Sequence, residues 1–202
     1  MSWQIAEVVL TCLALCGLYA LFHYSKLFKD RTLDEVIGYL RKVDWPEAKR
    51  LFDVYEEEKL MGFWTRRDFR RSQRARLDRA AEFLECMYHN NRIFLQWGST
   101  EYKDMLHHHL QYEPETLDGI VQLVKTARRF RRIALVTMFK IAFLSLLHFD
   151  KLHLLPIPSV AALRKVGGAD LLQAFEAVRD AAARLAGTAY GEEYAEEIMG
   201  SV

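Results

Sequence analysis

The segment Leu77–Tyr88 reads LDRAAEFLECMY, and its apolar side chains recur with the period of an α-helix. They occupy positions i, i+3, i+4, i+7, i+10 and i+11: Leu77, Ala80, Ala81, Leu84, Met87 and Tyr88. A strand would turn successive members of this set to opposite faces, so the pattern is helical. It predicts a helix from about Arg66 to Trp97, ended by the run Gly98-Ser99-Thr100.

The remaining chain beyond residue 30 carries further helix signals and no convincing alternation of period two. Thr32-Leu33-Asp34-Glu35 is a capping box, in which a hydroxyl and a carboxylate satisfy free N–H groups, and it predicts a helix to about Val43. Asp44-Trp45-Pro46 predicts a second helix to about Gly62 that buries Leu51, Phe52 and Tyr55. Further helices are expected over 100–110, 115–149, 160–166, 169–186 and 192–199, the last three being separated by Gly167-Gly168 and Gly187. We therefore predict an all-α fold.

The N-terminus carries an uncharged run, Val8–Ser25, that indicates a membrane anchor. The apolar stretch Ile5–Phe22 would rise about 27 Å as a helix, close to the ~30 Å hydrocarbon thickness of a bilayer. A cleaved signal peptide would begin with positive charge, whereas Glu7 stands there and no Lys or Arg precedes the run. A buried core helix is the remaining alternative.

Basic residues flank the apolar run on its C-terminal side alone. Lys26, Lys29, Arg31, Arg41 and Lys42 follow it, and Lys and Arg are retained on the cytoplasmic side of a membrane. We expect a single-pass protein of the cell membrane, with its N-terminus outside and its C-terminal domain in the cytoplasm.

A stripe of small residues inside the expected span could let two spans approach each other. Cys12, Cys16 and Ala20 lie at i, i+4 and i+8 and so share one helical face. Small residues also occur by chance in such a run, so the stripe offers a homo-oligomer contact without establishing one.

The expected division of the chain follows from these segments. Residues 1–25 form the transmembrane anchor, and 26–151 form a helical body that includes the long helix over about 115–149. Residues 152–159 contain Pro156 and Pro158 and are expected to be a linker. Residues 160–202 form a C-terminal helical segment that packs on the body.

A second apolar stretch, Ile133–Phe149, admits three interpretations. It could be a core helix, because Thr137, Lys140 and His148 lie near one side and would give it a narrow polar stripe. It could be a second span, although Lys140 at the bilayer centre would cost about 2.5 to 3.5 kcal/mol. It could also lie in the membrane interface.

The densest charge signal is a group of seven arginines within Arg66–Arg79. Arg67, Arg70, Arg71 and Arg74 share a helical face and could contact several phosphates, of which anionic lipid headgroups are the nearest to an anchored body. Nucleic acid is unlikely as the partner, because no recognition motif or aromatic platform accompanies the arginines. The alternatives are a protein partner or a solvated face paired with acids such as Glu57.

Signatures of catalysis or metal binding are weak. His107, His108 and His109 are adjacent and point about 100° apart on a helix, so they cannot converge on one ion. Cys86 and His89 lie three residues apart, but a lone cysteine is usually a small buried hydrophobe. We predict no catalytic, cofactor or metal residue.

Three functions remain open at this point. The first is an anchored cytoplasmic helical module that binds a partner or scaffolds a membrane complex. The second is a peripheral regulator that binds anionic lipid through the arginine face. The third is an enzyme whose site is assembled from separate helices and cannot be seen in the sequence.

Overall fold

The computed structural model describes residues 32–108, 113–147, 159–166 and 169–202. Within these ranges nearly every element is a helix, which confirms the predicted all-α fold. The expected anchor, residues 5–22, and the expected linker up to residue 158 lie outside the described residues. Among the helices that are described, none is both long enough and apolar enough to cross a membrane.

The elements follow one another in a simple order. They are α2 (Leu33–Gly38), α3 (Trp45–Leu51), α4 (Val54–Phe63), α5 (Arg66–His108), α6 (Pro114–Leu147), the 3₁₀ turn η1 (Ala161–Arg164), β1 (Lys165–Val166), β2 (Ala169–Asp170), α7 (Leu171–Tyr190) and α8 (Glu192–Ser201). The two short strands pair antiparallel, with Lys165 opposite Asp170 and Val166 opposite Ala169. The second strand of this ladder leads directly into α7.

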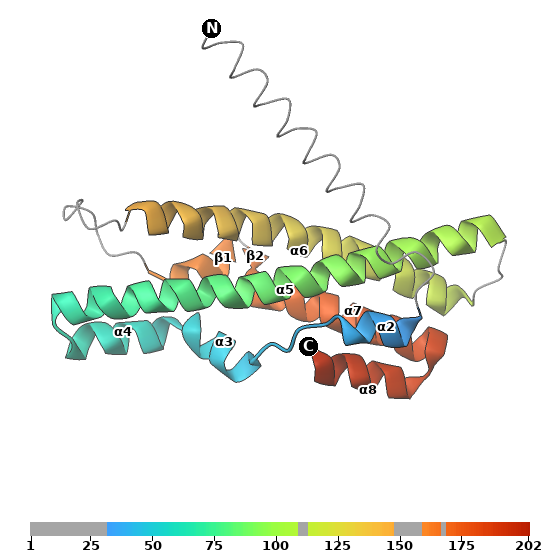
Figure 1. Ribbon diagram of the computed structural model, residues 1–202, viewed down its shortest axis with the longest axis horizontal. Helices are drawn as coiled ribbons and strands as arrows, with labels where there is room; N and C mark the ends of the chain where they lie inside the picture. Colours follow the sequence, from blue (N-terminus) through green and yellow to red (C-terminus); the bar gives the residue numbers. More distant parts are fainter. Residues whose placement is uncertain (1–31, 109–112, 148–158, 167–168) are drawn as a thin grey trace, which may run out of the picture.

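The long helices α5 and α6 run antiparallel, side by side, and form the frame of the molecule (Figure 1). Helix α7 packs on α6 and also contacts α5, and α8 folds back along α7. The short helices α3 and α4 pack against α5, while α2 reaches α8. Helix α6 therefore has neighbours on its inner side, where α5 and α7 meet.

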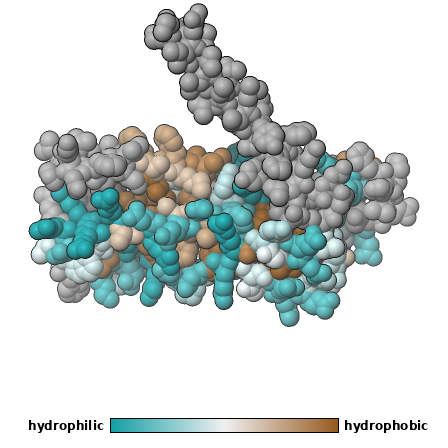
Figure 2. All heavy atoms as spheres, in the orientation of Figure 1, coloured by the Kyte–Doolittle hydropathy of each residue, from teal (hydrophilic) through white to brown (hydrophobic). Residues whose placement is uncertain are grey.

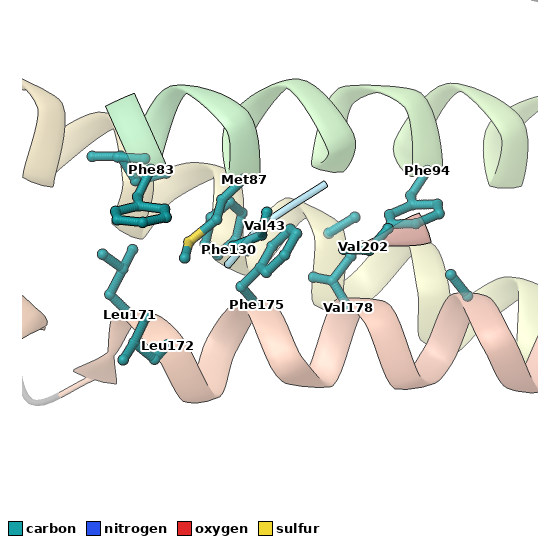
Figure 3. Packing of buried hydrophobic residues seen from close by; sticks show 14 of the residues in the cluster. Val43, Phe83, Met87, Phe94, Phe130, Leu171, Leu172, Phe175, Val178 and Val202 are labelled. Carbon is teal, nitrogen blue, oxygen red and sulfur yellow. The ribbon is translucent and has the colours of Figure 1, made fainter. Parts of the chain in front are cut away.

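The core is a single apolar cluster shared by these helices, and aromatic rings lie at its centre (Figure 3). The ring centroids of Phe130 on α6 and Phe175 on α7 lie 5.0 Å apart, and Trp45 stacks on Phe175 at 5.8 Å. The Trp45 indole N–H donates to the carbonyl of Val202 at 3.1 Å. Side chains from α3, α6 and α7 thus close around the same aromatic group.

Helix α2 is shorter than predicted. It begins where expected, but the Thr32 side chain makes no capping bond and the helix ends at Gly38. The buried Asn90 on α5 explains the early end: its carbonyl accepts from the Arg41 N–H at 2.8 Å, and its amide donates to the Arg41 carbonyl at 2.7 Å. The side chain thereby replaces the backbone partners that a longer helix would have supplied.

The predicted helix over 45–62 is divided into α3 and α4. Asp44 caps α3 by accepting from the Glu47 N–H at 3.0 Å, and Asp53 starts α4 by accepting from the Tyr55 N–H at 2.9 Å. Leu51 and Phe52 are buried as predicted, but Tyr55 is 69% exposed, so its predicted burial was wrong. The second cap turns α4 away from the direction of α3.

Two glycines expected to end helices lie inside them. Helix α5 continues through Gly98 to His108, and α7 continues through Gly187 to Tyr190. The break comes instead at Gly191, whose φ of +120° favours glycine. Helix α6 is likewise one continuous helix through its arginines.

The polar residues of α6 do not form a solvent-facing stripe. Thr137 is fully buried and its hydroxyl donates to the Ile133 carbonyl at 2.9 Å, whereas Lys140 is exposed and His148 lies outside the described residues. A hydroxyl that bonds the carbonyl four residues earlier needs no other partner. Of the predicted stripe, Thr137 is thus buried and Lys140 exposed, and the outer surface of this half of α6 is largely apolar.

Two adjacent buried asparagines give a direct test of this packing. Replacing Asn90 with Leu should destabilise the fold by about 2 kcal/mol, because both Arg41 backbone groups lose their partner. Asn91 is also fully buried, but neither its amide nitrogen nor its carbonyl oxygen has a hydrogen-bond partner. Asn91→Leu should therefore be neutral or stabilising, since it removes a desolvated polar group.

The measurement is thermal or urea unfolding of the full chain in detergent micelles, followed by circular dichroism. The two substitutions are chemically identical and lie one residue apart, so each serves as the control for the other. Equal effects of both would contradict the assigned bonds of Asn90.

Candidate functional site

The arginines of the first half of α5 divide into a paired group and an unpaired group. Arg76 belongs to the paired group: its side chain is largely buried and donates to the Leu51 carbonyl at 2.6 Å. The Glu57 carboxylate lies 3.9 Å from the Arg76 guanidinium and accepts from the Ala161 N–H at 2.8 Å. Arg76 and Glu57 thus join the end of α3, helix α4, helix α5 and the turn η1.

Arg79 is held between two glutamates. Its guanidinium donates twice to the Glu47 carboxylate, at 2.9 and 3.0 Å, and once to Glu82 at 2.6 Å. These bonds raise the pKa of Arg79, and the bond from Arg79 lowers the pKa of Glu47. Burial lowers the pKa of Arg76, and the charge of Glu57 opposes that effect. Both arginines therefore serve the packing of α5 against α3 and α4.

The predicted arginine face remains available for a ligand. Arg67, Arg71 and Arg74 are exposed and Arg70 is half-buried, and within the described ranges no acidic side chain forms an ion pair with any of the four. Arg71 lines an open hollow of about 620 Å³ together with Trp64 and Ser72. The nearby Asp68 is bound to the Thr65 hydroxyl. This face thus retains its positive charge.

Helix α4 presents a surface that the sequence did not reveal. Its polarity is reversed: the charged Glu57 is buried, and large apolar side chains are exposed. We call this set the α4 surface; it comprises Val54, Tyr55, Met61 and, just beyond the helix, Trp64. From the sequence, Glu57 was named only as a possible partner of a solvated arginine face. A buried ion pair, which sequence periodicity cannot show, reversed the orientation of the helix.

The structure does not support catalysis by Cys86 and His89 or metal binding within the described residues. The Nε2 atom of His89 lies 3.1 Å from the Tyr39 carbonyl, a distance at which Nε2–H donates to that oxygen, and this bond engages His89 away from Cys86. The side chains of His107 and His108 and all of His109 lie outside the described residues. Among the residues that are described, no three potential ligands lie together in a way that could hold a metal ion.

A cleft of about 660 Å³ between α3 and α7 collects several charged side chains. Lys49 pairs with Glu176 at 3.0 Å, and Arg164 pairs with Asp170 at 2.6 Å. Asp170 also caps α7 through the N–H groups of Leu172 and Gln173. These groups are engaged in holding β2 and α7 in place, so the cleft is built by structural ion pairs.

The chain was compared with known proteins at the level of families, single proteins and solved structures. No family model, curated protein or solved structure matches it. The stripe Cys12, Cys16 and Ala20 lies outside the described residues.

The environment of His89 predicts how stability depends on pH. Burial lowers the pKa of His89, and the charges of Arg41 and Arg92 add to this, while the bond to Tyr39 and the charge of Glu85 oppose it. An unfolded histidine takes up its proton near pH 6.5, and the folded chain resists the same protonation to a lower pH. His89 therefore makes the folded state less stable as pH falls through this window.

We expect the unfolding midpoint of the full chain to drop between about pH 8 and about pH 5.5, and to drop less in His89→Gln. Glutamine retains an N–H that can donate to the Tyr39 carbonyl but does not titrate. Unfolding of both proteins in the same detergent, measured at each pH, isolates the contribution of His89. Parallel pH curves for the two proteins would refute this assignment.

Proposed function

We propose that this chain is a membrane-anchored helical module that faces the cytoplasm and binds a partner protein within a membrane-associated complex. The observation that supports it best is the α4 surface. Four large apolar side chains are exposed on and beside one short helix, with exposed fractions between 45% and 69%. Several exposed apolar groups on one helix mark interaction sites more often than single exposed residues do.

The α4 surface is held in a fixed position. Glu57 lies on the buried side of α4 and is tied to Arg76 and to the backbone of Ala161. A surface that is already ordered loses little conformational entropy when a partner binds. Glu58 and Lys59 are both exposed on the same helix, so the partner we expect has an apolar groove with a polar rim.

The anchor supports the same proposal from the sequence side. The apolar stretch over residues 5–22 and the basic residues that follow it would hold the body at the cytoplasmic face of the cell membrane. The stripe Cys12, Cys16 and Ala20 offers a contact between two anchors, so a second copy of the chain is also a candidate partner.

A photo-crosslinking amino acid placed in the α4 surface tests the proposal. We expect the full chain with the crosslinker at Tyr55 or at Met61 to give a discrete heavier product in the cells that make it. The same substitution at Tyr102, an exposed residue near the far end of α5, is the matched control and should give no such product. The product is read by blotting after detergent extraction, and its mass distinguishes a second copy from another protein.

Two results would count against the module. One is recovery of the chain as a monomer without a product from either α4 position. The other is equal crosslinking at Tyr102, which would show that collisions rather than the α4 surface produce the signal. Retention of the chain in alkali-washed membranes, and its release when residues 1–25 are removed, tests the anchor separately.

The unpaired arginine face favours a second function, regulation through contact with anionic lipid. Arg67, Arg70, Arg71 and Arg74 have no acidic partner among the described residues, and each basic residue close to an anionic membrane contributes about 1 kcal/mol. The positive charge of this face is the specific observation that supports this function.

Native mass spectrometry of the detergent-solubilised full chain can count bound phosphatidylserine. We expect fewer bound lipids when the four arginines are changed to Gln. A control variant removes equal charge from exposed cations outside both this face and α6, namely Lys42, Arg50, Lys59 and Lys103. If the arginine variant and the wild type retain equal amounts of phosphatidylserine, lipid binding by this face is contradicted.

A further inference from the structure

The outer face of the C-terminal half of α6 is apolar and has no cover among the described residues. Leu135 and Val136 are each 46% exposed, Phe143 is 52% exposed and Phe139 is 74% exposed. The opposite side of the same turns is buried against the core through Ile133, Ala134, Thr137 and Ile141. Figure 2 shows hydrophobic residues gathered over α6, beside a band of hydrophilic residues.

Beyond its first two turns, the charge on this helix is entirely positive. Between Gly119 and Phe149 the sequence contains six Lys or Arg residues and no Asp or Glu. Arg128, Arg132 and Phe139 are spaced by four and seven residues, so they share a helical face with Leu135 and Val136. An exposed helix face that joins cations to aromatic and aliphatic side chains is typical of helices that lie in the plane of a membrane surface.

The arginines surround a hollow of suitable chemistry for a phosphate group. Arg128, Arg131 and Arg132 line an open space of about 490 Å³ together with Leu95 and Ser99 of α5. Within the described ranges none of these three arginines forms an ion pair with an acidic side chain. Arginine binds phosphate oxygens in a forked geometry, so this hollow is complementary to an anionic headgroup.

The cations and the phenyl rings follow one another along the same face of α6. Arg132 and Phe139 lie about 10 Å apart along the helix axis, at 1.5 Å per residue, so a helix lying flat on a surface would bring both to it. With the helix in the interface plane, the arginines would reach the headgroup phosphates while the phenyl rings enter the acyl boundary. A membrane surface would therefore bury the apolar residues of α6 without a second copy of this helix.

A second copy of α6 is a poor occupant of the same face. Pairing two such faces would bring the cations of both helices together without an acid between Gly119 and Phe149 to offset them. An anionic lipid surface offers both things that the face lacks, an apolar phase and negative charge. We propose that the outer face of α6 docks on an anionic phospholipid surface, with Arg128, Arg131 and Arg132 binding phosphate and Phe139 and Phe143 inserting into the acyl boundary.

This docking face is separate from the α4 surface and does not require that surface to bind a partner. It also involves no residue of the Arg67–Arg74 face. A test must therefore report on α6 locally, rather than on whether the chain is held by a membrane, because an anchor would retain every variant.

A nitroxide spin label at position 139 of the full chain gives such a local signal. Cys12, Cys16 and Cys86 are first replaced with Ala, and Phe139→Cys supplies the labelling site. The chain is reconstituted in phosphatidylcholine alone or in phosphatidylcholine mixed with phosphatidylserine. The collision rates of the label with oxygen and with a water-soluble nickel chelate report whether it lies in the acyl region or in water.

In the membranes that contain phosphatidylserine, we expect the ratio of oxygen to nickel collisions at position 139 to rise several-fold. Changing Arg128, Arg131 and Arg132 to Gln in the labelled chain should abolish the rise. A label at Met199 on α8, which lies across the bundle from α6 in Figure 1, should remain in water in both membranes.

Three results would overturn the proposal. The label at position 139 could stay in water in both membranes, or be equally protected without phosphatidylserine, which would remove the role of the arginines. Spin–spin broadening between labels would instead identify a second copy as the occupant. If the α4 surface binds no partner, the crosslinking experiment will show it, and the collision ratio of the label at position 139 will be unchanged.

Discussion

The close contact of α5 with α6 at Gly98 is the constraint on which the rest of the structure depends. A Cβ atom at this position would lie 3.1 Å from Leu123 Cδ2 and 3.3 Å from Val124 Cγ2, tighter than side chains normally approach. On the other side of α6, a Cβ at Gly119 would lie 3.4 Å from Leu185 Cδ1 of α7. Helix α6 is thus held closely between two neighbours, and its inner face is fully used in that packing. Its outer face has no remaining neighbour among the described residues, which is why apolar side chains there stay exposed.

Charge is distributed unevenly in this fold, although the net charge is only +1. Acidic residues are dense on α4 and α8. Three acids on α3, α4 and α5 are engaged with Arg76 and Arg79: Glu47, Glu57 and Glu82. Within the described ranges, cations without acidic partners remain on the first turns of α5 and along α6. Because opposite charges cancel in the sum over the chain, the net charge does not reveal these positive regions, whereas the positions of the ion pairs do.

Local sequence was sufficient to predict most of the helices but not where several of them end or which way they face. The helix expected over 160–166 was wrong, because residues 161–166 form η1 and β1. The stripe from Leu77 to Tyr88 predicted α5 because its period depends on neighbouring residues alone. The end of α2 depends on Asn90, 49 residues away from Arg41, and the orientation of α4 depends on the Glu57–Arg76 pair. Gly98 was interpreted as a helix end because glycine weakens an isolated helix, whereas here the close approach of α6 requires it. The arginine face could be proposed from spacing, but only the ion pairs show that the neighbouring Arg76 and Arg79 are already engaged.

The α4 surface and the outer face of α6 can be occupied at the same time. An anchor would make the weak binding of α6 to a membrane effective. Helix α5 lies between α4 and α6 (Figure 1), so docking of α6 on a membrane would leave the α4 surface directed away from the lipid. A few arginines and two phenyl rings bind a membrane weakly when the protein is free in solution. A tether that ends near Lys26 would convert that binding into an intramolecular step with a high effective concentration, so that a small contact energy is enough to fix the orientation of the body. The anchor would then supply attachment, α6 would supply orientation, and the α4 surface would be presented to a partner in a defined direction.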